Sequence, residues 1–302
     1  MSVWTQILTR RTLLGTAILV PFAGCATATK GPQAQPSPAP PVAAIDPYVA
    51  LEEKYDARIG VFAIDTGTGA ELNHRADERF AFCSTYKTLA AAAILHQTSP
   101  TQLNASLTYT AADVLAHSPI TEQHVATGMT IRALCEAAVR NSDNTAANLL
   151  VREVGGPSGV TDFARTLGDT ATRMDRLEPA LNEAIPGDPR DTTTPRAFGT
   201  DYQKLVVDGA LDSQARTMLT EWLVNNTTGS AGIRSSAPAG WQVGDKTGSG
   251  YYGSTNDIAV IWPPGAKPIV LAIMSSRTTK NAVADSTLIA DATRVVINVI
   301  GK

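Results

Sequence analysis

Residues 82–87 read FCSTYK and are followed at once by TLAAAAILHQ, and this stretch links the fold of the chain to its chemistry. The alanine-rich run predicts a helix over 87–96 that packs tightly against its surroundings, because alanine has the highest helix propensity and a small side chain. Residues three apart are neighbours on a helix, about one turn apart. Lys87 is therefore expected to present its amine beside the Ser84 hydroxyl, either as an ordinary first helical turn or beside an activated nucleophile.

Strand patterns lie on both sides of a long helical region. Residues 58–80 are typical of a strand, a turn and a second strand, and three later apolar runs predict strands over 240–248, 256–263 and 268–276. The chain closes on an apolar-faced helical pattern over 286–300. Between the two groups of strands, helical patterns dominate, and the last two of them lie between Thr200 and Asn226.

These elements predict an α+β fold with one antiparallel sheet of about five strands flanked by helices. The first helix, near 47–57, and the last helix are expected on one face of the sheet. The middle helices form an inserted all-α lobe between the second and third strands. We expect an α/β lobe over 45–80 and 200–302, an α lobe over 81–199, and a site in the cleft between them.

The composition excludes several classes of function. A formal net charge of −3, with 43% hydrophobic and 18% charged residues, is ordinary for a globular protein, and the basic residues form no patch for nucleic acid. The histidines and cysteines lack zinc-ligand spacing, so no metal is expected. Cys83 and Cys135 are expected to be free thiols, although a bond between them stays an alternative.

The N-terminus has the features of an export signal. A twin arginine at 10–11 precedes an apolar run over 13–23 that is short for a bilayer span. We assign 1–30 to this signal, with either lipidation at Cys25 or plain cleavage nearby. Residues 31–44 are rich in proline and alanine and predict an extended tether before a folded body over 45–302.

Four short motifs follow one another in the body: Ser84-x-x-Lys87, Ser142-Asp143-Asn144, Glu178-x-x-Leu181-Asn182 and Lys246-Thr247-Gly248. Each alone has an ordinary structural interpretation as a turn, a cap or a strand end. Together, in this order, they resemble the class A serine β-lactamases, in particular the actinobacterial branch. The resemblance covers the chain from about residue 46 onward and implies the serine β-lactamase/D,D-peptidase-like fold.

The resemblance implies that Ser84 attacks a β-lactam and carries the acyl group. Either Lys87 or Glu178, acting through a water, would take its proton. The backbone N–H groups of Ser84 and Ser249 would form the oxyanion hole. Ser142 would relay a proton to the departing lactam nitrogen, with Lys246 adding positive charge.

Further residues would bind the substrate. By resemblance, Asn144 would hydrogen-bond its amide side chain, and Thr247 and Ser249 its carboxylate. Gly248 has no Cβ and would let the strand edge approach the ligand closely. His117 would lie at the rim of the cleft, or be an exposed loop histidine.

Glu178 and Asn182 decide which activity the resemblance implies. A carboxylate and an amide on one loop turn can hold and deprotonate the water that frees the acyl-enzyme. Peptidoglycan-synthesising relatives lack this pair. The alternatives are a D,D-peptidase or penicillin-binding protein of the same fold, and a non-catalytic penicillin-sensing domain. Arg176 and Asp191 bracket the loop as a possible clamp, and Pro179 suggests a cis peptide bond.

One departure from the family concerns the substrate carboxylate. The positions where many relatives carry an arginine are here Gly232 and Thr255. Either Arg234 or Arg277 substitutes, or the carboxylate is held more loosely. The resemblance further implies no cofactor, a small-molecule substrate, a monomer, and an exported enzyme in the periplasm or outside the cell.

Overall fold

The structure is a computed structural model, and it describes residues 46–301. The expected export signal, Cys25 and the tether over 31–44 lie outside the described residues. None of the helices within 46–301 has the length and apolar character needed to span a bilayer.

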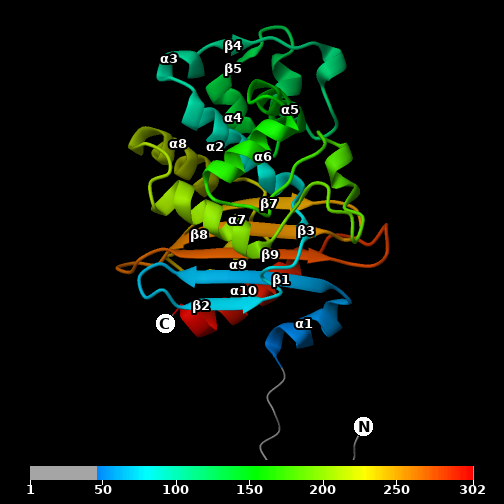
Figure 1. The fold of residues 1–302 in the computed structure, drawn as a ribbon, viewed down its shortest axis with the longest axis vertical. Coiled ribbons are helices and arrows are strands. Elements are labelled where there is room, and N and C mark those ends of the chain that lie inside the picture. Colours follow the sequence, from blue (N-terminus) through cyan, green and yellow to red (C-terminus); the bar gives the residue numbers. More distant parts are fainter. Residues whose placement is uncertain (1–45, 302) are drawn as a thin grey trace, which may run out of the picture. The chain divides into compact units, whose positions relative to one another are not determined.

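Five strands form one antiparallel sheet in the order β2–β1–β9–β8–β7 (Figure 1). Their bounds are β1 (Arg58–Asp65), β2 (Glu71–His74), β7 (Gln242–Ser249), β8 (Thr255–Trp262) and β9 (Ile269–Ser276). The expected sheet is confirmed, and the three late strands lie where their apolar runs predict. β8 and β9 are buried along almost their whole length, which explains why their sequences are continuously apolar and do not alternate.

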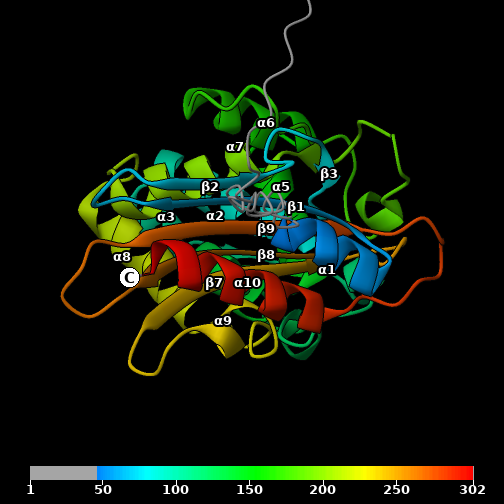
Figure 2. The same cartoon turned by 90° about the horizontal axis from the view of Figure 1, so that it is seen from below.

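One face of the sheet is covered by three helices (Figure 2). They are α1 (Pro47–Tyr55), α9 (Ile233–Ser236) and α10 (Ser286–Ile300). The first and last helices therefore share one face, as the sequence predicts. Their contacts with the sheet form a separate apolar core that includes Ile59, Val61, Leu271, Ile289 and Val296.

The opposite face carries α7 (Pro195–Tyr202), which continues into a π-helical turn, η5 (Gln203–Val207). The sequence predicts this helix only from Thr200 onward. It begins earlier because the Thr194 side chain accepts a hydrogen bond from the N–H of Ala197 and caps the first turn. The expected lobe boundary between 199 and 200 therefore falls inside α7.

The remaining helices gather beyond the β7 edge of the sheet (Figure 1). They are α2 (Lys87–Gln97), α3 (Pro100–Leu103), α4 (Ile131–Arg140), α5 (Asn144–Glu153), α6 (Pro157–Thr166) and α8 (Ser213–Val224). Short segments connect them: β4 (Ser106–Leu107), η2 (Ala111–Asp113), η3 (Thr121–His124) and β5 (Met129–Thr130). Helix α2 contacts α4, α5, α6 and α8 and is buried from its first residue to Leu95, so its alanines allow close packing on every side.

A long loop connects α6 to α7, where the sequence shows little periodicity. It contains one short helical turn, η4 (Ala180–Glu183), and the strand β6 (Thr192–Thr193), which pairs with β3 (Phe80–Ala81). The expected clamp is present: Arg176 Nε lies 2.6 Å from Oδ2 of the fully buried Asp191. The Glu178–Pro179 peptide bond is cis, as the sequence suggests.

Candidate active site

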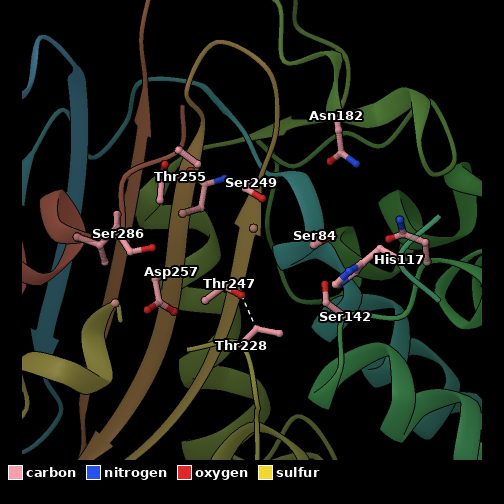
Figure 3. Close-up of a pocket in the computed structure, with 16 residues that line it drawn as sticks. Ser84, His117, Ser142, Asn182, Thr228, Thr247, Ser249, Thr255, Asp257 and Ser286 are labelled. Atoms are coloured by element: carbon pink, nitrogen blue, oxygen red, sulfur yellow. Dashed lines mark hydrogen bonds between the residues drawn. The ribbon is translucent and has the colours of Figure 1, made fainter. Parts of the chain in front are cut away.

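A cavity of about 410 Å³ lies between the end of β7 and the helical lobe (Figure 3). Eight of the residues expected at the site line it: Ser84, His117, Ser142, Asn144, Asn182, Thr247, Gly248 and Ser249. The other three, Lys87, Glu178 and Lys246, are buried directly beside these. The structure therefore brings together all eleven residues that the sequence analysis expects at the site.

Ser84 lies in the short helical segment η1 (Cys83–Tyr86), which runs directly into α2 at Lys87. The Ser84 Oγ donates a hydrogen bond to Glu178 Oε1 at 3.3 Å. Lys87 Nζ lies 3.2 Å from the same Glu178 Oε1, so the serine hydroxyl and the lysine amine meet at one carboxylate oxygen. Lys87 Nζ also donates to Ser142 O at 2.8 Å and to Asn144 Oδ1 at 2.6 Å.

Lys87 and Lys246 are fully buried next to the cavity. Burial lowers the pKa of Lys87 below its ordinary value, against the opposing effect of Glu178, whose Oε1 lies 3.2 Å from the amine. Burial and the nearby charge of Lys87 lower the pKa of Lys246 to about 7. Lys246 therefore exchanges protons near neutral pH, which is the property that acid–base chemistry needs.

Ser142 connects the two lysines. Its Oγ accepts hydrogen bonds from Lys246 Nζ at 3.1 Å and from Lys87 Nζ at 3.3 Å. Its backbone has a φ of 56°, in the left-handed region that non-glycine residues seldom occupy and that is enriched at functional sites. The Ser142 hydroxyl is therefore held between two donors at the cavity wall.

Asp143 explains how this segment keeps its shape. The buried carboxylate caps α5 by accepting the N–H of Ala146, and it also accepts the N–H groups of Ile120 and Thr121. The loop that carries His117 is thereby tied to the start of α5. Asp143 is a structural residue, and its neighbours on either side face the cavity.

The Glu178 side chain is completely buried and turned towards the nucleophile. Asn182 Nδ2 donates to its Oε2 at 2.6 Å. Asn148, which the motif analysis does not single out, makes two hydrogen bonds to the backbone of Glu178. Its Nδ2 donates to the Glu178 carbonyl oxygen at 3.0 Å, and its Oδ1 accepts from the Glu178 N–H at 2.9 Å. The only signal in the sequence is that Asn148 follows Asn144 by one helical turn on α5.

Gly248 serves a further purpose besides lining the cavity. A Cβ at this position would lie 2.9 Å from Phe82 O and 3.0 Å from Ser84 N. The missing side chain therefore lets β7 approach the backbone of η1. Close contact between β7 and η1 fixes the distance between Ser249 and Ser84.

No arginine is among the described residues that line the cavity. Arg234 is paired with the buried carboxylate of Asp245, and Arg277 Nη2 lies 3.6 Å from Asp285 Oδ2. The expectation that one of these arginines substitutes at the carboxylate site is therefore wrong, because both are held by other carboxylates. The alternative, looser binding of the carboxylate, remains.

Thr228 is a further residue of the cavity wall that the motifs do not reveal. Its Oγ1 lies 2.5 Å from Thr247 Oγ1 (Figure 3).

Cys83 and Cys135 are buried free thiols, as expected. Within residues 46–301, no three histidine, cysteine or acidic side chains gather in a way that suits a metal ion.

At this site an accessible serine is surrounded by a buried lysine, a buried carboxylate and a second serine. Enzymes that form an ester on serine have this arrangement. The family model of the beta-lactamase enzyme family matches residues 43–300, and the chain belongs to this family. A beta-lactamase of Amycolatopsis lactamdurans is 53% identical over 267 residues, 88% of each chain. A beta-lactamase of Mycobacterium tuberculosis is 50% identical over 89% of each chain.

Solved structures agree with this assignment. The beta-lactamase from Desulfarculus baarsii superposes with a TM-score of 0.83 at 50% identity, covering 85% of this chain and 96% of that one. The class A beta-lactamase from Clostridium kluyveri has a TM-score of 0.83 at 46% identity, covering 84% and 97%. The predicted class A β-lactamase and its α+β fold are confirmed.

Proposed function

We propose that this protein hydrolyses β-lactam antibiotics through an acyl-enzyme on Ser84, and that Glu178 activates the water that releases the product. The observation that carries this proposal is the position of the Glu178 carboxylate. One of its oxygens accepts from Ser84 Oγ at 3.3 Å and the other from Asn182 Nδ2 at 2.6 Å. The relatives named beta-lactamases support the same activity.

In acylation, the Ser84 oxygen attacks the lactam carbonyl and its proton passes to Lys87, whose Nζ lies 3.2 Å from the Glu178 Oε1 that also accepts from Ser84 Oγ, so Glu178 stays ionised. The C–N bond then breaks, and the nitrogen takes a proton from Ser142. Lys87, which is hydrogen-bonded to Ser142 Oγ, passes the proton that it took from Ser84 on to Ser142, so each enzyme group other than Ser84 regains its starting protonation. The product of this step is an ester on Ser84 and a protonated ring nitrogen.

The oxyanion formed during attack needs donors at the cavity wall. We assign this task to the backbone N–H groups of Ser84, in the first turn before α2, and of Ser249 at the end of β7. Asn144 binds the amide side chain of the substrate, and Thr247 and Ser249 bind its carboxylate, with Lys246 supplying positive charge. His117, exposed at the wall of the cavity, forms the rim.

In deacylation, a water held by Glu178 and Asn182 attacks the ester carbonyl. Glu178 takes the proton of this water, and the proton returns to Ser84 Oγ as the ester bond breaks. The enzyme is then regenerated with its proton count unchanged. A D,D-peptidase or a penicillin-sensing domain would lack this second step.

Steady-state turnover of nitrocefin separates these alternatives. We expect many turnovers per enzyme molecule, whereas one stoichiometric burst would favour the peptidase or the sensor. Intact-mass measurement of Glu178→Ala after mixing with a penicillin is expected to show a long-lived adduct. A Glu178→Ala variant that turns over like the unmodified enzyme would overturn the assignment of the water-activating base.

We further propose that the chain is exported through the signal over 1–30 and works as a monomer in the periplasm or outside the cell. The tether over 31–44 would separate the enzyme body over 45–302 from a lipid anchor at Cys25 or from a nearby cleavage site. Metabolic labelling with a palmitate analogue, compared with a Cys25→Ser variant, separates these two forms.

A further inference from the structure

The hydroxyl groups of Thr228 and Thr247 form a short hydrogen bond at the cavity wall, 2.5 Å between the oxygens (Figure 3). Thr228 precedes α9, and Thr247 belongs to β7. Each hydroxyl has one proton, so only one of them donates in this bond. Which one donates decides whether Thr247 has a proton available for a substrate.

The neighbouring Asn226 shows which hydroxyl donates. Its Oδ1 accepts from the backbone N–H of Thr228 at 3.0 Å, a group that only donates, so the atom facing it is the amide oxygen. The same Oδ1 lies 2.8 Å from Thr228 Oγ1, and an amide oxygen only accepts. The proton of Thr228 is therefore committed to Asn226. The bond between the two threonines must use the proton of Thr247.

The orientation of Asn226 is held at its other end as well. Its Nδ2 donates to Asp245 Oδ2 at 2.7 Å, and the other oxygen of this buried carboxylate is paired with Arg234. The segment is also packed tightly, because a Cβ at Gly229 would lie 1.8 Å from Asp245 Oδ2. Thr228 is thus held in place by a chain of hydrogen bonds that begins at a buried ion pair.

In the unliganded protein Thr247 therefore points its proton away from the space where the substrate carboxylate is proposed to bind. We propose that Thr228 is a positioning residue that determines specificity for substrates with a free carboxylate. When the carboxylate binds, Thr247 turns its proton to it, and Thr228 turns its own proton from Asn226 to Thr247 Oγ1. Asn226 Oδ1 still accepts the hydrogen bond from the backbone N–H of Thr228, so no polar group loses all its partners.

This inference rests on the proposed function, because it needs Thr247 to contact the carboxylate of a β-lactam. Its test compares a cephalosporin with a free carboxylate and the methyl ester of the same compound. In Thr228→Val, no hydroxyl is left to donate to Thr247 Oγ1 when Thr247 turns its proton to the carboxylate. The kcat/KM for the free acid is therefore expected to fall about tenfold. The ester, which has no charge to bind, is expected to change less than about twofold.

Two further variants control for structure. Thr228→Ser restores the hydroxyl and is expected to recover most of the free-acid activity. Thr227→Val makes the same change at the neighbouring exposed position, whose hydroxyl donates to Arg140 O at 2.8 Å, away from the cavity, and is expected to leave both substrates unaffected. Equal losses for acid and ester in Thr228→Val would overturn the inference, as would no loss or a selective gain for the acid.

A double variant tests whether Thr228 acts through Thr247. In a Thr247→Val background, Thr228→Val is expected to change the acid kcat/KM by less than about twofold, since the proposed relay is already absent. A full tenfold loss in that background would show that Thr228 contacts the substrate directly and would overturn the positioning role. Failure of the proposed function is distinguished by two other readouts, because then the unmodified enzyme shows no steady-state turnover of nitrocefin and Glu178→Ala forms no adduct on Ser84 by intact mass.

Discussion

Glu178 Oε1 lies 3.3 Å from Ser84 Oγ, although the two residues are 94 positions apart in the chain. The carboxylate belongs to a loop, and the hydroxyl to the segment that starts the central helix of the α lobe. The loop is held in this position by the Arg176–Asp191 ion pair and by Asn148, so the carboxylate faces the nucleophile before any substrate arrives. This pre-organisation underlies the first two predictions.

Removing the charge of Glu178 is expected to stop deacylation selectively. In Glu178→Gln, an amide of nearly the same shape replaces the carboxylate but cannot take a proton from water. We expect kcat for a penicillin to fall about a thousandfold, with the acyl-enzyme accumulating in intact-mass spectra. Glu153→Gln, at the exposed end of α5, is the matched control. A normal kcat for Glu178→Gln would contradict the mechanism.

Asn148→Ala is expected to weaken the hold on the Glu178 backbone. Both of the hydrogen bonds that Asn148 makes to Glu178 are buried, so their loss leaves the N–H and C=O groups without partners. We expect deacylation to slow about 10- to 100-fold, with a smaller effect on acylation. Pre-steady-state kinetics with nitrocefin would show this as a burst that the unmodified enzyme lacks. Equal slowing of both steps would indicate a general loss of structure.

The charge of Lys246 is expected to appear in the pH profile. Since its pKa is lowered to about 7, the amine carries its charge below that pH and loses it above. For a substrate with a free carboxylate, kcat/KM is expected to fall as pH rises through about 7, and this fall is the limb of the pH profile that reports Lys246. For the methyl ester of the same substrate, kcat/KM is expected to show no such fall. Lys246→Arg keeps its charge at all working pH values and is expected to move the limb upward. An unchanged limb in Lys246→Arg would assign it to another group.

A second prediction on pH concerns stability. Asp201 of α7 is fully buried. Burial and the neighbouring Asp169 raise the pKa of Asp201 to about 9, with Lys204 and Arg165 opposing this weakly. The folded protein keeps this proton while the unfolded chain releases it above about pH 4. Stability is therefore expected to fall as pH rises from about 4 to about 9.

Asp201→Asn removes this titration because the amide is neutral at every pH. Its Tm is expected to exceed that of the unmodified protein by roughly 4 °C or more at pH 8, with the difference shrinking towards pH 4. Thermal unfolding followed by circular dichroism at several pH values measures this. A difference in Tm that stays constant with pH would mean that Asp201 is ionised in the folded protein.

Local patterns in the sequence were sufficient for most of the elements. The apolar runs of β8 and β9 are long because both faces of the sheet are covered, so their bounds follow from composition alone. The start of α7 was missed because its cap, Thr194, lies at the end of a proline-rich loop with no periodicity. The pairing of β3 with β6 was also missed, because two-residue strands carry no pattern and depend on contacts far apart in the chain.

The motifs determined which residues meet at the site, since each is a short segment whose chemistry is visible in its letters. Only the tertiary structure decided what each side chain contacts: Ser84 donates to Glu178, Gly248 lets β7 approach the backbone of η1, and Arg234 is held by Asp245. Such contacts join residues that are distant in the chain, and no local pattern specifies them. The direction of one proton between Thr228 and Thr247 depends on the same long-range placement.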